Sequence, residues 1–199
     1  IYQDKIITTG FGDRNYSRNR EFKPYFVEDG HAVPSLIPEK NKEDILKTVN
    51  SANRALGINW GVAKGDILLK GNKVYVLEMA ARTSGGWFCA GTVPIAKGVN
   101  ILKPFIKMSI GEPIRENDLK PRYTRGACQR YIIPTKEGIF EKIEGLEKAK
   151  KMPGIKMLVL FDKLKKGVLV KKATNHSERL GQIIAEGRDV REATKRCEE

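Results

Sequence analysis

The chain has 199 residues, 40% of them apolar and 31% charged, so it can bury a core in one domain or two small ones and is not a disordered chain. No apolar run approaches the roughly 20 residues that a membrane helix needs, which argues against a membrane protein. The net charge of +13 indicates anionic partners, such as nucleic acid or phosphate-bearing ligands.

The first 35 residues are predicted to hold little regular structure. Residues 1–9 fit a strand, and residues 10–24 fit a polar loop rich in arginine and asparagine. A second, short strand is expected over residues 25–27. The glycine and proline of residues 30–35 favour a turn.

A helix and a hairpin are predicted next. Apolar residues fall on one helical face between residues 42 and 56, and Gly57 stands where a C-terminal cap belongs. Residues 60–69 and 74–82 are rich in strand formers, and residues 70–73 join them, so they predict two paired strands. The apolar face of the helix consists of Ile45, Leu46, Val49, Ala52 and Leu56.

Two further helices and a linker are expected before the last third of the chain. The first helical stretch follows Gly86 and ends at Gly98, and the second covers residues 100–110. Residues 113–124 are polar and contain two prolines, so we read them as a linker.

The last third is predicted to be rich in strands. Residues 145–151 fit a short helix, and Asp189 with Glu192 forms a D-x-x-E capping box that opens a final helix. Three segments are expected to be strands: 128–133, 155–161 and 168–172. These elements together predict an α+β protein with one domain over residues 1–112, an antiparallel sheet with helices, and a small β-rich α/β domain over residues 113–199.

Cysteine usage indicates a reducing compartment. The chain has an odd number of cysteines, Cys89, Cys128 and Cys197, and no C-x-x-C motif, so it supports neither a disulfide framework nor a zinc site. The two histidines, His31 and His176, lack metal-ligand spacing and are interpreted as structural. We therefore expect a cytoplasmic protein.

The predicted hairpin carries the residues that point to chemistry. If residues 71–73 form its loop, Asp66 faces Glu78 and Leu68 faces Val76. Two carboxylates directly opposite each other repel, so a lysine, a shared proton or a divalent cation must offset their charge. Magnesium prefers one or two carboxylates together with phosphate oxygens and water. The residues expected on this face are Asp66, Leu68, Val76, Glu78, Ala80 and Arg82.

Two neighbouring features favour a bound phosphate. Arg82 would lie on the same face as Glu78, roughly 13 Å along the strand, where an arginine suits a phosphate or an anionic substrate. Backbone amides of Ser84, Gly85 and Gly86 could then approach an anion at a helix start. The alternative is an ordinary hairpin, in which lysines pair with Asp66 and Glu78 and Ser84 only caps a helix.

The sequences Gly65-Asp66-Ile67-Leu68-Leu69 and Leu77-Glu78-Met79-Ala80-Ala81-Arg82 resemble the C-terminal active-site pattern of the ATP-grasp ligases. The pattern is similar to the branch that includes biotin carboxylase, the large chain of carbamoyl phosphate synthase and the L-amino acid ligases. Further segments that resemble this branch are residues 26–35, 126–154 and 177–181.

The resemblance implies a role for each residue of the pattern. Asp66 and Glu78 would bind magnesium (or manganese) on the phosphates of ATP, and Leu68 would sit against the adenine. Arg82 would hold a phosphate or the carboxyl substrate. The stretch Ser84-Gly85-Gly86 is similar to the glycine-rich segment of the family and would bind the nucleotide.

The resemblance also implies an ATP-dependent ligase that joins a carboxylate to an amine through an acyl phosphate and releases ADP and phosphate. The family's N-terminal domain, with its phosphate-binding lysines and adenine-binding hinge, would precede Ile1. We therefore expect a fragment that is inactive alone. Its partners would be ATP, a small carboxylate or amino-acid-like substrate, and the N-terminal half of the enzyme, on the same chain or on a split partner; a homodimer is compatible with this.

Three alternatives stay open, one of which is a pseudo-enzyme or carrier that keeps the fold and lacks turnover. Another is carbamoyl-phosphate-synthase-like or biotin-carboxylase-like chemistry. The family usually has asparagine as a third metal ligand where this sequence has Ala80, and the E-x-A-A-R form is similar to that of the L-amino acid ligases. The third is a basic nucleic-acid-binding module, which the scattering of the lysines among glutamates disfavours.

Overall fold

The computed structural model describes residues 1–3, 5–162 and 164–199. Two compact units share the chain. Unit 1 consists of residues 1–10 and 36–122, and unit 2 consists of residues 11–35 and 123–199. Both units are therefore discontinuous in sequence. The division differs from the expected pair of domains mainly in residues 11–35, which join the C-terminal part of the chain.

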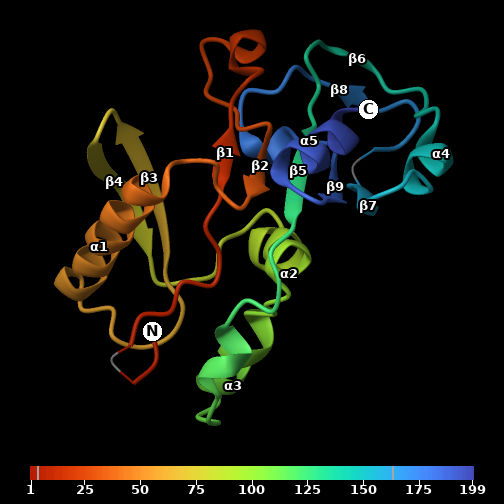
Figure 1. Cartoon of the computed structure of the whole chain (residues 1–199). Helices are drawn as coiled ribbons and strands as arrows, with labels where there is room; N and C mark the ends of the chain where they lie inside the picture. Colours follow the sequence, from red (N-terminus) through yellow and green to blue (C-terminus); the bar gives the residue numbers. More distant parts are fainter. Residues whose placement is uncertain (4, 163) are drawn as a thin grey trace. The chain divides into compact units, whose positions relative to one another are not determined.

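Unit 1 combines a two-stranded sheet with helices, and its longest helix packs against strand β4 (Figure 1). That helix, α1, covers Glu39–Ala55, and Gly57 follows it with a φ of 68°, as expected of a cap. The remaining elements are β3 (Lys64–Lys70), β4 (Lys73–Ala80), the π-helical turn η2 (Phe88–Thr92), α2 (Val93–Lys97), α3 (Leu102–Ser109) and the short 3₁₀ helix η3 (Glu116–Leu119).

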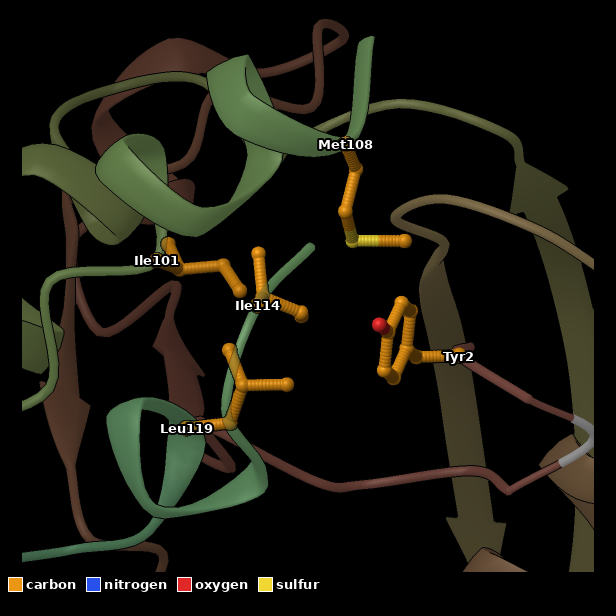
Figure 2. Close-up of a cluster of buried hydrophobic side chains, with 5 residues drawn as sticks. All are labelled: Tyr2, Ile101, Met108, Ile114 and Leu119. Carbon is orange, nitrogen blue, oxygen red and sulfur yellow. The ribbon is translucent and has the colours of Figure 1, made fainter. Parts of the chain in front are cut away.

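Unit 1 contains an apolar cluster whose members come from distant parts of the chain, including helices α3 and η3. Figure 2 shows its side chains pointing toward one another. Burial of this apolar surface stabilises unit 1. The cluster consists of Tyr2, Ile101, Met108, Ile114 and Leu119.

Unit 2 is built on a five-stranded antiparallel sheet with the order β1-β2-β5-β9-β7. Helix α5 (Val190–Glu198) packs on β5 and β9, where Cys128, Ala185, Ala193 and Cys197 form a small apolar core. The strands are β1 (Asp13–Asn15), β2 (Gly30–Val33), β5 (Gly126–Ile132), β7 (Ile155–Leu160) and β9 (Gly181–Gly187); β6 (Gly138–Ile139), β8 (Leu169–Val170), α4 (Leu146–Lys150), η1 (Asn19–Phe22) and η4 (His176–Glu178) complete the unit.

The start of the chain differs from the prediction. No strand occurs among the described residues of 1–9, because this segment has no partner strand: Ile1 exchanges two hydrogen bonds with Gly61, of 2.7 and 3.0 Å, and Tyr2 enters the apolar cluster. Residues 25–27 are not a strand either. The strand begins three residues later, at Gly30, within the segment predicted to be a turn.

Two other segments also differ from the prediction. Residues 113–124 are more than a linker, since Ile114 and Leu119 enter the core of unit 1. Strand β9 was missed, although it is paired on both sides, by β5 and β7. None of the helices in the described ranges combines the length and apolar character that crossing a membrane requires.

Candidate functional site

The turn of the β3–β4 hairpin is tighter than expected. Lys70 pairs with Lys73, so the turn has two residues and not three. The pairing next to the turn is therefore displaced by one residue, and Leu68 lies opposite Tyr75. The prediction that Leu68 faces Val76 is wrong.

A β-bulge then corrects the displacement. Ile67 pairs with Val76, but the next pair is Asp66 with Glu78, which leaves Leu77 as an extra residue on β4. The two carboxylates consequently lie opposite each other, as the sequence predicted for this pair. Val76, by contrast, alternates to the other face of the hairpin.

A lysine bridges the two carboxylates. The Nζ atom of Lys64 lies 2.6 Å from Oδ2 of Asp66 and 3.1 Å from Oε1 of Glu78. The Lys64 side chain is only 10% exposed, against 24% for Asp66 and 50% for Glu78. Of the three possible offsets, the structure therefore contains the lysine. This arrangement agrees with the alternative of an ordinary hairpin, in which lysines pair with Asp66 and Glu78. Lys64 precedes Asp66 by two residues and so shares its face of the strand, but the sequence pattern did not single it out.

The side chain of Arg82 lies beside that of Glu78, although Arg82 itself follows the end of strand β4. Strand β4 ends at Ala80, and the amide of Arg82 donates to the carbonyl oxygen of Ala80 at 2.9 Å, so the chain turns sharply. This turn brings Nη2 of Arg82 to 3.6 Å from Oε1 of Glu78. The expectation that Arg82 belongs to the strand is therefore wrong, and its side chain forms part of one charge cluster with Lys64, Asp66 and Glu78.

The glycine-rich stretch leads into η2. Gly86 and Trp87 both have positive φ, of 61° and 63°, and Trp87, not Ser84, holds the N-cap position. A backbone hydrogen bond from Ser84 reaches the thiol of Cys89, whose pKa burial raises. A Cβ on Gly85 would meet nothing within 4 Å, so its backbone borders open space. Nucleotide binding by this stretch stays a prediction.

The hairpin offers suitable donors for a divalent cation. Carboxylate oxygens are the ligands that magnesium prefers, and Asp66 and Glu78 present them from opposite strands. The described residues contain no group of three or more His, Cys, Asp or Glu side chains that could hold a metal by themselves. A cation here would therefore depend on this pair together with phosphate oxygens and water.

Unit 2 contains a buried polar cluster that the sequence analysis did not find. Glu28 is 6% exposed and accepts a hydrogen bond of 2.6 Å from Nη1 of Arg14. Nη2 of Arg179 donates to the backbone carbonyl oxygen of Glu28 at 2.6 Å, and the Glu28 amide donates to Nε2 of His176 at 3.1 Å. Both histidines border this cluster, since His31 lies 3.8 Å from the Glu28 carboxylate.

Comparison with known proteins places these observations in a family context. Residues 130–199 match the family model of the L-amino acid ligase C-terminal domain 2. The chain is 25% identical over 185 residues to the uncharacterized protein y4rH of Sinorhizobium fredii. It is 27% identical over 176 residues to the formate-dependent phosphoribosylglycinamide formyltransferase of Sulfurisphaera tokodaii. These matches cover 93% and 87% of this chain but only 36% and 39% of the relatives.

Solved structures show the same fold. An L-amino acid ligase from Bacillus licheniformis superposes with a TM-score of 0.83 at 24% identity, over 97% of this chain and 46% of that chain. A phosphoribosylglycinamide synthetase from Anaerococcus prevotii gives 0.78 at 24% identity, over 95% and 46%. The predicted fold class is thereby confirmed: the chain has the fold of the C-terminal part of ATP-grasp ligases and spans less than half the length of these relatives.

Proposed function

We propose that this chain forms the magnesium- and phosphate-holding part of an ATP-dependent ligase that joins a carboxylate to an amine. The pairing of Asp66 with Glu78 across the hairpin carries this proposal, because it places two carboxylates, whose oxygens are the ligands that magnesium prefers, opposite each other on neighbouring strands. The ATP-grasp fold supports it, as does the similarity to two ligases, an L-amino acid ligase and a phosphoribosylglycinamide synthetase.

Each predicted residue has a role in this proposal. Asp66 and Glu78 would hold magnesium or manganese, which supplies positive charge next to the phosphates of ATP. Arg82 would orient a phosphate or the carboxylate substrate through its planar fork. Leu68 would contact the adenine. The amides of residues 84–86 would bind phosphate oxygens, because donors fixed in place need no reorganisation during the reaction.

The proposed reaction has two steps, phosphoryl transfer to the carboxylate and attack by the amine. A carboxylate oxygen of the substrate attacks the terminal phosphorus of ATP, the bond to ADP breaks, and an acyl phosphate forms. The nitrogen of the amine then attacks the acyl carbon, phosphate leaves with the bonding electrons, and the nitrogen loses a proton. Positioning and electrostatic stabilisation by the protein suffice, since phosphoryl transfer needs little covalent help.

The remaining parts of the proposal concern partners and location. The lysines that bind the phosphates of ATP and the hinge that binds adenine would come from an N-terminal half. The carboxylate substrate would be a small or amino-acid-like molecule. A cytoplasmic location is proposed because Cys89, Cys128 and Cys197 are all free thiols.

The decisive experiment measures ADP release by the full-length protein with magnesium, ATP and a panel of amino acids and small carboxylates. We expect release that depends on one class of substrate. Glu78→Gln should lower this rate by about a hundredfold or more, a typical cost of losing an electrostatic contact in an active site. Glu137→Gln, which makes the same charge change at an exposed site in unit 2, should leave the rate unchanged.

Two results would count against the proposal. If no carboxylate in the panel changes the rate of ADP release, the ligase reaction is excluded. Equal rates in Glu78→Gln and Glu137→Gln would show that the Asp66–Glu78 pair is only structural.

A further inference from the structure

We propose that Lys64 is a built-in cation that occupies the carboxylate pair when no metal is bound, so that the pair accepts a divalent cation only together with a nucleotide. This inference rests on the proposed function in one respect: it takes Asp66 and Glu78 as the metal ligands. Lys64 would act through these two side chains, as a positioning residue.

The position of Lys64 is fixed by the hairpin. It lies directly opposite Ala80, whose methyl group leaves space for the long lysine side chain on that face. The side chain is nearly buried, and its ammonium group contacts one carboxylate on each strand. An ammonium group donates up to three hydrogen bonds, so it can bind both carboxylates at once.

The charges of the cluster explain why free metal would bind poorly. The negative charges of Asp66 and Glu78 are balanced by Lys64 and by Arg82, which lies 3.6 Å from Glu78. A free divalent ion entering this neutral cluster would meet the ammonium of Lys64 at short range, and this repulsion opposes binding. A metal that arrives on ATP brings phosphate charges with it, and those phosphates give the ammonium and the guanidinium new partners.

Lys64 differs from Arg82 in its exposure and in the number of carboxylates that it contacts. The arginine side chain is 57% exposed and, of the two carboxylates, contacts Glu78; its other hydrogen bond, of 3.1 Å, goes to the exposed backbone carbonyl oxygen of Thr83, so it can turn away into water when a cation binds. Lys64 is enclosed and bound to both carboxylates, and its charge stays in the cluster. The lysine is therefore the residue that sets the affinity of the pair for free metal.

The test is a titration of the full-length protein with manganese in the absence of nucleotide, with free Mn²⁺ measured by electron paramagnetic resonance. Lys64→Met should bind one Mn²⁺ at least about tenfold more tightly than the unaltered protein, because the repulsion between a unit charge and a divalent ion at contact exceeds the energy of a tenfold change. Lys64→Arg, which keeps the charge, should show no gain.

Matched controls separate this effect from a change in net charge. Lys70→Met removes the same charge from an exposed position on the same strand and should bind Mn²⁺ as the unaltered protein does. Adding Asp66→Asn to Lys64→Met should abolish the gain. A second measurement, thermal unfolding, should show that magnesium raises the midpoint of Lys64→Met but not that of Lys70→Met, since metal then offsets the repelling carboxylates.

Equal affinity for Mn²⁺ in Lys64→Met and Lys70→Met would overturn the inference, whether or not the protein is a ligase. If Lys64→Met does not fold, Lys64→Gln gives the same comparison with a polar side chain. Failure of the proposed function is seen separately, as absence of ADP release, because metal titration requires no turnover.

Discussion

Glu28 shows how single residues balance burial against charge in this chain. Burial, the largest influence, acts to raise the pKa of Glu28, but the hydrogen bond with His31 and the charges of Arg14 and Arg179 outweigh it, and the pKa lies below its usual value. Burial lowers the pKa of His31 despite the nearby carboxylate, so folding favours the neutral form of this histidine. Burial also lowers the pKa of His176.

These shifts predict that the protein loses stability as the pH falls from about 7 to about 5. An unfolded histidine titrates near pH 6.5, whereas the folded pKa of His31 and of His176 is lower, so the unfolded state binds more protons in this range. Each histidine can contribute at most about 1.4 kcal/mol per pH unit. The pKa of Glu28 is lowered from 4.5, so the stability that its ionised carboxylate contributes is lost only below about pH 4.5.

Urea unfolding at pH 7.5, 6.5 and 5.5 measures this dependence. His31→Gln should make the decline in the free energy of unfolding shallower between pH 7 and 5. An unchanged slope in the variant would show that folding does not lower the pKa of His31.

The end of strand β9 and the start of helix α5 carry a prediction at the scale of a single element. Oδ1 of Asp189 accepts a hydrogen bond from the amide of Glu192 at 2.9 Å, which confirms the predicted N-cap. The Glu192 carboxylate, however, accepts from the amide of Arg188 at 2.7 Å and not from that of Asp189, so the expected capping box is only half formed.

Replacing Asp189 by alanine should lower the free energy of unfolding by about 1 kcal/mol, because one amide of the first turn loses its partner. Asp189→Asn keeps a capping oxygen and should retain most of the stability. The midpoint of urea unfolding measures both, and equal midpoints for the two variants would contradict a capping role.

Elements with strong local signals could be predicted from sequence, and those formed by tertiary pairing could not. Helix α1 has an apolar face and a glycine cap, and β3 and β4 are rich in strand formers. Strand β9 carries Gln182, which is buried and bonded to Gln129 on β5 at 2.8 Å, so polar residues hide its apolar pattern. Only the partner strand makes this strand recognisable.

The same distinction holds for the candidate site. The pairing of Asp66 with Glu78 followed from the alternation of side chains, although a shorter turn and the bulge at Leu77 offset each other to produce it. The position of Arg82 did not follow, because the sharp turn after β4 depends on backbone hydrogen bonds that no spacing rule contains. The contact of Lys64 with Asp66 could have been predicted, because residues two apart on a strand have side chains on the same face.

At the scale of the whole molecule, the discontinuity of unit 2 predicts which pieces of the chain can fold. Residues 123–199 alone lack β1 and β2, so β5 loses a paired strand. They also lose Phe22 and Val27, two members of an apolar cluster in unit 2. We therefore expect this piece to show no cooperative unfolding, even though it contains the family match at residues 130–199.

Joining residues 11–35 to residues 123–199 through a short glycine-rich loop should restore cooperative unfolding. Val33 pairs with Ala127, so the end of β2 lies beside the start of β5, as in a hairpin. Circular dichroism during urea unfolding compares the two polypeptides. A cooperative transition in residues 123–199 alone, at the same midpoint, would show that β1 and β2 contribute nothing to stability.

The placement of residues 36–122 between two paired strands also has a consequence for the order of folding. Strand β2 can pair with β5 only after the chain closes a loop that contains nearly all of unit 1, and the entropy lost in closing a loop grows with its length. The β3–β4 hairpin, in contrast, joins neighbours in sequence. Because distant pairings form slowly, the central sheet of unit 2 should be the last part to assemble, and until then β5 exposes an edge to other chains.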